Sequence, residues 1–261
     1  MGPDQQQRGA AFRALHEGDP FVIPNPWDRG SARELEALGF RALATTSSGF
    51  ALTLGRRDGE VSLDEVAEHV RAVASATTLP LSVDLENGYG ERPDEASAAI
   101  VRAAEAGAVG GSIEDWDAAG GIYSLEHAAE RVRAAVDAAR ALGFPFVLTA
   151  RAENHIRGNP DLEDTIARLR AYEDAGADVL YAPGLGSAEE IRTVCERVSR
   201  PVNVLAHPGL TIDAIVDAGA QRISVGGSLA FVAYGAMAAA AQRLLDGDLA
   251  ALTPQVRLRH I

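Results

Sequence analysis

The sequence contains no lysine, and all 24 of its basic residues are arginine. Without lysine the chain can form no Schiff base with a carbonyl substrate and can anchor no pyridoxal phosphate. The same absence excludes a Walker A loop, which needs a lysine to reach the β- and γ-phosphates of a nucleotide. Aldolases of the Schiff-base type and P-loop NTPases are therefore excluded.

Cysteine, net positive charge and long apolar runs are scarce as well. The one cysteine, Cys195, permits no internal disulfide, which fits a reducing cytoplasm. The formal net charge of −13 argues against nucleic acid and anionic membranes as partners, because both attract basic patches. No apolar run approaches the roughly 20 residues of a membrane span, and the chain start lacks the apolar core of a signal peptide. We therefore expect a cytoplasmic protein with no nucleic-acid or membrane partner.

The residues that are present form a repeating pattern of short apolar segments, polar turns and alanine-rich amphipathic segments. Hydrophobic residues make up 47% of the 261 residues, enough for one large domain. Strands are predicted at 21–26, 42–47, 81–86, 110–116, 146–151, 179–184, 201–206 and 222–227. Helices are predicted at 2–17, 31–38, 63–76, 93–106, 124–142, 162–175, 187–198, 212–218 and 229–245.

Signals at the helix ends support this reading. Ser62 precedes one predicted helix and Glu65 follows it three residues later, the pattern of a capping box. Four glycines stand just past predicted helices, at the usual left-handed stop position: Gly107, Gly143, Gly176 and Gly219.

Strands that alternate with helices form parallel βαβ units, and eight such units at this length predict a (β/α)8 TIM-type barrel. We expect one domain over residues 1–261, with an N-terminal helix within 1–20 and a C-terminal helix and tail within 229–261. The tail from 249 is expected to be an arm or disordered. A doubly wound open sheet is the competing architecture, but residues 25–28 carry no glycine-rich fingerprint after the first strand.

The segment 82–90, with the sequence SVDLENGYG, places two carboxylates at the end of a predicted strand. Because side chains alternate along a strand, Asp84 and Glu86 are expected to point the same way. Two hard oxygen ligands at such a position favour Mg2+. The alternative is a solvated strand end followed by an ordinary turn.

Other charged residues are predicted at the same end of the barrel, where TIM-barrel chemistry is located. Asp58 lies in the loop after the second strand, Glu114 ends the fourth strand and Arg151 ends the fifth. Such a carboxylate ring repels itself unless a cation neutralises it, and Arg151 would neutralise an anionic substrate or intermediate. We therefore expect a metal-bound carboxylic acid whose reaction develops negative charge on oxygen. The small-residue turn after the second strand and two later strand ends supply the candidate substrate-binding residues: Ser47, Ser48, Gly49, Phe50, Tyr181 and Asn203.

Four segments in this order resemble the isocitrate lyase / phosphoenolpyruvate mutase superfamily, with matching spacing from about residue 21 to 227: 47–58, 84–90, 112–115 (SIED) and 149–153 (TARAE). Residues 201–206 and 222–227 look like the mutase-like branch of that superfamily. The resemblance implies a (β/α)8 barrel, a 2-oxo acid or enolpyruvate ligand, and a homotetramer or homodimer in which helix 229–245 is exchanged between subunits.

The resemblance also implies roles for individual residues. Mg2+, with Mn2+ as an alternative, would be bound largely through water at Asp84, Glu86 and Glu114, with Asp58 nearby. The ligand carboxylate would lie on the backbone of Ser48 and Gly49. Arg151 would stabilise the enolate, which makes the expected catalytic residues Arg151, Asp58 and Glu114.

Segment 116–124 departs from the family pattern, because it lacks the cysteine, lysine and histidine that family enzymes carry in their gating loop. Cleavage of isocitrate by the usual cysteine, and C–P bond chemistry, are therefore not expected. Decarboxylation of oxaloacetate or a related 2-oxo diacid needs only a metal and Arg151, and is the predicted reaction. Two alternatives stay open. One is a retro-aldol lyase acting on a substituted malate- or isocitrate-type acid, with Tyr123, Tyr181 or His207 as base; the other is a 2-oxo acid binding protein without turnover.

Overall fold

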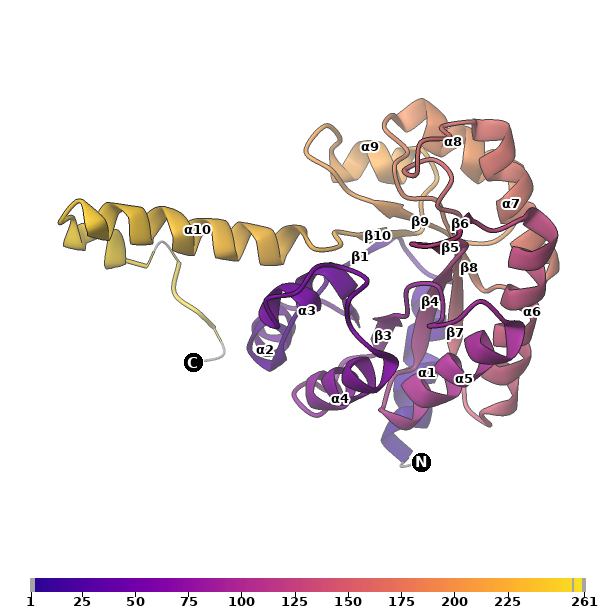
Figure 1. Cartoon of the computed structure of the whole chain (residues 1–261), viewed down its shortest axis with the longest axis horizontal. Coiled ribbons are helices and arrows are strands. Elements are labelled where there is room, and N and C mark those ends of the chain that lie inside the picture. Colours follow the sequence, from indigo (N-terminus) through magenta and orange to yellow (C-terminus); the bar gives the residue numbers. More distant parts are fainter. Residues whose placement is uncertain (1–2, 255, 260–261) are drawn as a thin grey trace.

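The computed structural model describes residues 3–254 and 256–259. Eight parallel strands form a nearly closed barrel in the order β1-β10-β9-β8-β7-β4-β3-β2 (Figure 1). Their bounds are β1 (Phe21–Ile23), β2 (Leu43–Ala44), β3 (Leu81–Asp84), β4 (Gly110–Glu114), β7 (Val147–Arg151), β8 (Val179–Tyr181), β9 (Val202–Leu205) and β10 (Arg222–Ser224). The predicted (β/α)8 barrel is confirmed.

Two hydrogen bonds join the end strands of this order, β1 and β2, just beyond β1. The backbone N–H of Ala44 donates to the carbonyl of Pro24 at 3.1 Å. The side-chain amide of Asn25 donates to the carbonyl of Thr45 at 3.0 Å. These contacts bring the ends of all eight strands to one rim.

Helices cover the outside of the barrel, as Figure 1 shows. Their bounds are α1 (Pro3–Leu15), α2 (Arg29–Ala37), α3 (Ser47–Thr53), α4 (Leu63–Ala74), α5 (Pro93–Glu105), α6 (Leu125–Ala141), α7 (Leu162–Asp174), α8 (Ala188–Arg197), α9 (Ile212–Asp217), α10 (Ser228–Leu245) and the short 3-10 helix η1 (Leu249–Leu252). The capping box that begins α4 is present, with Ser62 and Glu65 bonded to each other's backbone N–H. The four stop glycines have φ between +76° and +107°, as predicted.

Two elements differ from the prediction. Segment 47–53 is the helix α3 and not a turn, because the Thr46 side chain caps it by accepting from the N–H of Gly49. Residues 116–122 form a small antiparallel hairpin, β5 (Trp116–Asp117) with β6 (Gly121–Ile122). The predicted N-terminal helix began at Gly2, which lies outside the described residues.

Helix α1 closes the end of the barrel where the strands begin. The Gln5 side-chain amide donates to the carbonyls of Ala104 and Ala108 at 2.8 and 3.0 Å. Phe12 is fully buried against Gly110, the first residue of β4. This end of the barrel is filled, so the opposite rim is left for chemistry.

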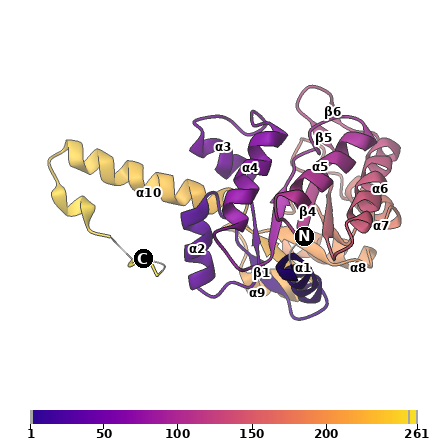
Figure 2. The ribbon, with the colours of Figure 1, turned by 90° about the horizontal axis from the view of Figure 1, so that it is seen from below.

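Helix α10 extends away from the barrel in both views (Figures 1 and 2). Its one buried residue is Ala230, whereas Phe231, Val232 and Met237 are 54%, 68% and 60% exposed. By length and composition it is the one helix in residues 3–254 and 256–259 that could cross a membrane. The expectation of no such apolar run was wrong, because small alanines make α10 apolar without a block of large side chains.

The described part of the tail after α10 is not a free arm along its whole length. It contains η1, and the backbone N–H of Arg259 donates to the Glu34 carboxylate of α2 at 2.9 and 2.8 Å. Residues 255, 260 and 261, which belonged to the predicted tail, lie outside the described residues.

The close contact between α1 and β4 predicts an effect of Gly110→Ala on stability. A Cβ at this position would lie 2.6 Å from Cε1 of Phe12 and 3.0 Å from the carbonyl oxygen of Val147. Overpacking of this kind costs about 1–3 kcal/mol, so Tm should fall by on the order of 5 °C. In Gly18→Ala the nearest atom would be 3.6 Å away, and Tm should change by less than about 2 °C. Equal Tm values for the two variants would contradict the packing.

Candidate active site

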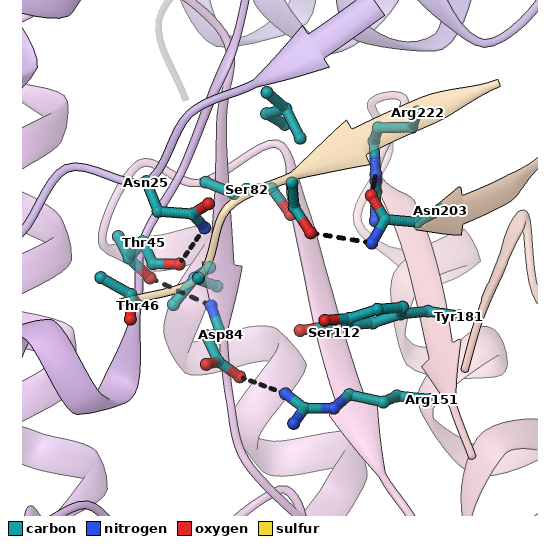
Figure 3. A pocket seen from close by; sticks show the side chains of 15 residues that line it. Asn25, Thr45, Thr46, Ser82, Asp84, Ser112, Arg151, Tyr181, Asn203 and Arg222 are labelled. Atoms are coloured by element: carbon teal, nitrogen blue, oxygen red, sulfur yellow. Dashed lines mark hydrogen bonds and ion pairs between the residues drawn. The ribbon is translucent and has the colours of Figure 1, made fainter. Parts of the chain in front are cut away.

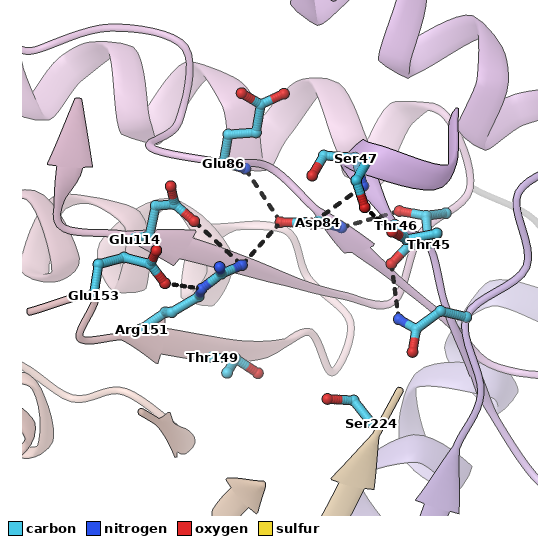
Figure 4. A network of polar contacts seen from close by, with 12 residues as sticks. Thr45, Thr46, Ser47, Asp84, Glu86, Glu114, Thr149, Arg151, Glu153 and Ser224 are labelled. Carbon is cyan, nitrogen blue, oxygen red and sulfur yellow. Dashed lines mark hydrogen bonds and ion pairs between the residues drawn. The ribbon is translucent and has the colours of Figure 1, made fainter. Parts of the chain in front are cut away.

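Asp84, the last residue of β3, is held at the open rim by its neighbours on β2 and α3. Its backbone N–H donates to Oγ1 of Thr45 at 3.0 Å. Its carboxylate accepts from the backbone N–H of Ser47 at 3.2 Å, as Figure 4 shows. The carboxylate therefore has a fixed position at the strand end, as predicted.

Glu86 does not follow the predicted strand alternation. The strand ends at Asp84, and Glu86 has φ of +48°, which turns the chain out of the strand. Tyr89, three residues on, also has a positive φ of +60°, and its hydroxyl donates to the Glu86 carboxylate at 3.3 Å. Left-handed residues cannot continue a strand, so the prediction that Asp84 and Glu86 share a strand face was wrong. Figure 4 shows the Glu86 carboxylate directed away from Arg151.

Arg151, at the end of β7, is the centre of the polar cluster (Figure 4). Its Nε donates to the carboxylate of Glu153. Its Nη1 lies 3.2 Å from Glu114 and 3.8 Å from Asp84. Its guanidinium carbon lies 5.2 Å from the ring centroid of Tyr181. The structure thus brings Arg151, Glu114 and Asp84 together, as the positions of these residues at the strand ends predict.

Two residues that the sequence analysis did not select complete the cluster. The Glu153 side chain is fully buried, and it pairs with both Arg151 and Arg157, the latter at 3.0 Å. The Arg157 guanidinium carbon lies 3.5 Å from the ring centroid of Trp116, and its Nη2 lies 3.7 Å from Glu114. Glu153 lies in the motif TARAE together with Arg151, and this motif could have identified it in the sequence. Arg157 lies in an irregular loop, and no sequence motif marks it.

Burial and mutual repulsion raise the pKa values of the carboxyl groups. Burial first, and then Asp84 and Asp58, raise the pKa of Glu86 to about 7. The pKa of Glu114 is well above its usual value because of burial, which the nearby Arg151 opposes. Exclusion of water also raises the pKa of Asp58, and Asp84 adds to this, while a hydrogen bond with Ser47 works against it. The rim carries more negative charge than its arginines neutralise.

The donor set fits a hydrated divalent cation. Within the described ranges, no three carboxylate, imidazole or thiolate groups converge closely enough to enclose an ion by themselves. The Arg151 guanidinium lies within ion-pair distance of both Asp84 and Glu114, two of the three predicted ligands. Mg2+ commonly keeps several waters and uses one or two carboxylates. Asp84 and Glu86 as ligands of such an ion, with Glu114 and Asp58 contacting its waters, stay a prediction.

A cavity leads from this cluster into the barrel (Figure 3). Four of the predicted site residues line it: Asp84, Arg151, Tyr181 and Asn203. Glu86 and Glu114 line a separate outer pocket that also contains Trp116. The site is therefore divided into an inner and an outer part that meet at Arg151 and its carboxylates.

The predicted substrate-binding residues on α3 are placed less directly. The backbone N–H of Ser47 already donates to Asp84, and that of Gly49 donates to Thr46. The Ser48 hydroxyl shares a hydrogen bond with that of Thr46 at 3.1 Å. Phe50 points toward α4, where its ring stacks on His69 at 3.9 Å between centroids. A carboxylate at this helix start stays a prediction, and Phe50 does not line the cavity.

The segment corresponding to the family gating loop is tied down by hydrogen bonds. In the β5–β6 hairpin, Asp117 accepts from the backbone N–H groups of Ala119 and Gly120, both at 2.8 Å. The Asn87 amide donates to Asp117 at 3.1 Å and to the Tyr123 hydroxyl at 3.0 Å. These bonds anchor the hairpin to the turn after β3.

The fold and the site define a (β/α)8-barrel enzyme with carboxylates and arginine gathered at the carboxyl ends of its strands. A family model described as phosphoenolpyruvate phosphomutase matches residues 12–245, and the chain belongs to this family. An uncharacterized protein of Mycobacterium tuberculosis is 32% identical over 89% of this chain and 88% of its own length. A crystal structure from Burkholderia cenocepacia J2315 is 49% identical with a TM-score of 0.95, covering 99% of this chain and 95% of that one. The predicted superfamily is confirmed.

Relatives with named activities act on oxo and hydroxy acids. The oxaloacetate decarboxylase of Rhodopseudomonas palustris is 29% identical over 98% of this chain and 90% of its own length. The 2-methylisocitrate lyase of Escherichia coli is 31% identical over 74% of this chain and 68% of its own length. A structure of oxaloacetate acetylhydrolase with the product oxalate has a TM-score of 0.84 at 28% identity, covering 95% of this chain and 91% of that one. The predicted class, a carbon–carbon lyase, is confirmed at the level of the family.

The raised pKa of Glu86 predicts how stability depends on pH in a metal-free buffer containing EDTA. Folded Glu86 keeps its proton up to about pH 7, whereas the unfolded chain loses it near the ordinary value of 4.5. The folded state then binds more protons between these values, so the free energy of unfolding should fall as pH rises from 5 to 8. The contribution of Glu86 is at most about 3 kcal/mol.

Glu86→Gln should flatten this pH dependence, leaving a smaller slope from Glu114 and Asp58. Glu91→Gln, at an exposed position, is the matched control and should leave the slope unchanged. Urea unfolding at several pH values measures the effect. An identical slope in wild type and Glu86→Gln would show that Glu86 ionises normally.

Proposed function

We propose that the protein decarboxylates oxaloacetate or a related 2-oxo diacid with the help of Mg2+ or Mn2+. The observation that carries this proposal is Arg151, held between Glu114, Glu153 and Asp84 at the rim of the barrel. A partly buried, fixed guanidinium is suited to an oxygen that becomes negative during the reaction. The named relatives that act on oxaloacetate support the same choice of substrate.

The reaction breaks the C3–C4 bond of oxaloacetate, releases CO2 and leaves its electron pair in the enolate of pyruvate. Arg151 would donate hydrogen bonds to the enolate oxygen on C2. Glu114 and Glu153 would keep the guanidinium oriented, since each pairs with a different nitrogen. C3 then takes a proton from water, so no side chain has to act as a strong base.

Asp84 and Glu86 would hold the divalent cation, with Asp58 and Glu114 contacting its waters. The cation supplies a Lewis acid that polarises the 2-oxo group. Without the cation, burial and then the neighbouring carboxylates raise the pKa values of Glu86 and Glu114.

The structure makes a retro-aldol reaction a weaker second candidate, because the bases considered for it are poorly suited. Burial raises the pKa of Tyr181 to about 12, so its hydroxyl stays protonated at neutral pH. Burial also raises the pKa of Tyr123, which is fixed by Asn87. Nδ1 of His207 accepts a hydrogen bond from Gly209. Decarboxylation, which needs none of these residues, fits better.

We further propose a cytoplasmic homotetramer or homodimer in which α10 packs on a neighbouring copy. The exposed apolar face of α10 and its separation from its own barrel support this arrangement. Burial of such a face against a second copy removes apolar surface from water. Membrane association is the competing explanation for the same helix.

The catalytic proposal predicts that the protein with Mg2+ forms pyruvate from oxaloacetate well above the rate with Mg2+ alone. Arg151→Met and Asp84→Asn should each lower kcat by about 100-fold or more, because each removes a preorganised charge. Arg92→Met and Asp94→Asn are matched controls in an exposed ion pair and should retain wild-type rates. NMR follows oxaloacetate and pyruvate directly, with EDTA as the metal-free control.

Oxaloacetate decay at the metal-only rate would overturn the decarboxylase proposal. Cleavage of a branched 2-hydroxy diacid instead would establish the retro-aldol lyase. Line broadening of the ligand without any product would establish the binding protein.

The proposal for α10 predicts a solution mass of two or four 27.4-kDa chains. Val232→Glu with Met237→Glu should lower this mass, because both side chains are exposed on α10. Ile212→Glu, at a 44% exposed position on α9, should leave it unchanged. Light scattering measures the mass. A monomeric wild type, or one that sediments with lipid vesicles, would contradict the proposed assembly.

A further inference from the structure

Arg222 is a buried cation inside the barrel, on the wall of the inner cavity (Figure 3). It is the first residue of β10 and is 5% exposed. Its Nε donates to Oδ1 of Asn203 at 2.8 Å and its Nη2 to Oγ1 of Thr149 at 3.0 Å. Its Nη1 lies 3.3 Å from Nε2 of His16, the residue that follows helix α1. The guanidinium is thus fixed in orientation on the cavity wall.

All three of these partners are neutral. Burial and then the nearby Arg222 lower the pKa of His16 to about 3, so the imidazole carries no charge at neutral pH. Over the described residues, no carboxylate lies within ion-pair distance of Arg222. Arg151, the other arginine on the wall of this cavity, pairs with Glu114 and Glu153. Arg222 therefore differs from Arg151 in lacking a counter-charge.

An isolated buried charge is costly, and arginine cannot avoid the cost by losing its proton. Arg131 provides a comparison within the chain. It is also deeply buried, but it donates to the backbone carbonyls of Asn87, Gly90 and Glu91, which carry strong partial negative charge. Arg222 has one amide oxygen, one hydroxyl and one ring nitrogen. A bound anion would supply what these partners lack.

The wall around Arg222 carries several polar side chains beside apolar ones, whereas Val, Ile and Leu layers usually fill a TIM barrel. Ser82, Ser112, Tyr181 and Ser224 line the same cavity. These groups can donate hydrogen bonds to an anion. The one carboxylate on the wall is Asp84, at the mouth. The charge in the deep part of the cavity is therefore positive.

We propose that Arg222 binds the distal carboxylate of a diacid whose 2-oxo acid end lies at Asp84 and Arg151. This proposal rests on the proposed function for the placement of the reacting end. It assigns the inner cavity as a specificity subsite that selects a diacid over a monoacid. Asn203 positions the guanidinium there, since it holds Arg222 through Oδ1 and donates to Ser224 at 3.0 Å.

Arg222 and Arg151 line the same cavity, so a ligand with an anionic group at each end can meet both. The hydrogen bond from Arg222 to Thr149, which stands two residues before Arg151 on β7, places Arg222 on the inner side of Arg151. A monoacid such as pyruvate would leave the inner guanidinium without an anion.

The test compares two unreactive ligands that differ in the distal carboxylate, malate and lactate. Their Kd values are measured by calorimetry with Mg2+ present, for wild type, Arg222→Met and Arg222→Lys. Wild type should bind malate at least about tenfold more tightly than lactate, as expected for a buried charged hydrogen bond. Arg222→Met should abolish this preference by weakening malate and leaving lactate within about twofold. Arg222→Lys, which keeps the charge, should retain part of the preference for malate.

A purely structural role for Arg222 would give a different result, because lower stability would affect both ligands alike. Equal weakening of malate and lactate in Arg222→Met, or no preference for malate in wild type, would overturn the subsite. The Tm of each unliganded variant shows whether it is folded, and Arg222→Lys provides the comparison if Arg222→Met is not. A clear malate preference in a protein that does not decarboxylate oxaloacetate would refute the proposed reaction and leave the subsite standing.

Discussion

The attraction between the Arg151 guanidinium and three surrounding carboxylates is the interaction on which the site depends. Glu114, Glu153 and Asp84 come from three different parts of the chain, and each is partly or fully buried. Removing one partner from such a network leaves an uncompensated buried charge, which costs more than the pair contributes. The network therefore fixes the ends of β3, β4 and β7 relative to one another. It also holds the Arg151 guanidinium at the mouth of the cavity.

The rest of the barrel keeps that network at one end. Helix α1 fills the opposite end, where Phe12 packs on Gly110. The hairpin β5–β6 covers the outer side of the site and is fastened by Asn87, Asp117 and Tyr123. The family uses this position for a mobile loop that handles a proton, according to the resemblance seen in the sequence. A fixed hairpin without such a side chain suits a reaction whose proton comes from water.

The barrel could be predicted because it depends on local signals repeated eight times, namely apolar strands, capped helices and stop glycines. Asp84, Glu114 and Arg151 could be placed because parallel strands end at one rim. Other features depend on conformation or distant contacts that no local pattern encodes. Glu86 lies in a left-handed turn, and Arg157 is defined by its contact with Trp116. The sequence places Arg222 at the start of a strand, and only the closed barrel shows that it is buried inside.

The central claim is that the carboxylates around Arg151 form a site for a divalent cation and a 2-oxo acid. X-ray diffraction from crystals soaked with Mn2+ and oxalate, recorded so that the anomalous signal locates manganese, tests this claim most directly. We predict one manganese peak at the carboxylate of Asp84, close to Glu86, with oxalate between the metal and Arg151. Manganese bound only elsewhere, or oxalate bound away from Arg151 at saturating concentrations of both, would contradict it.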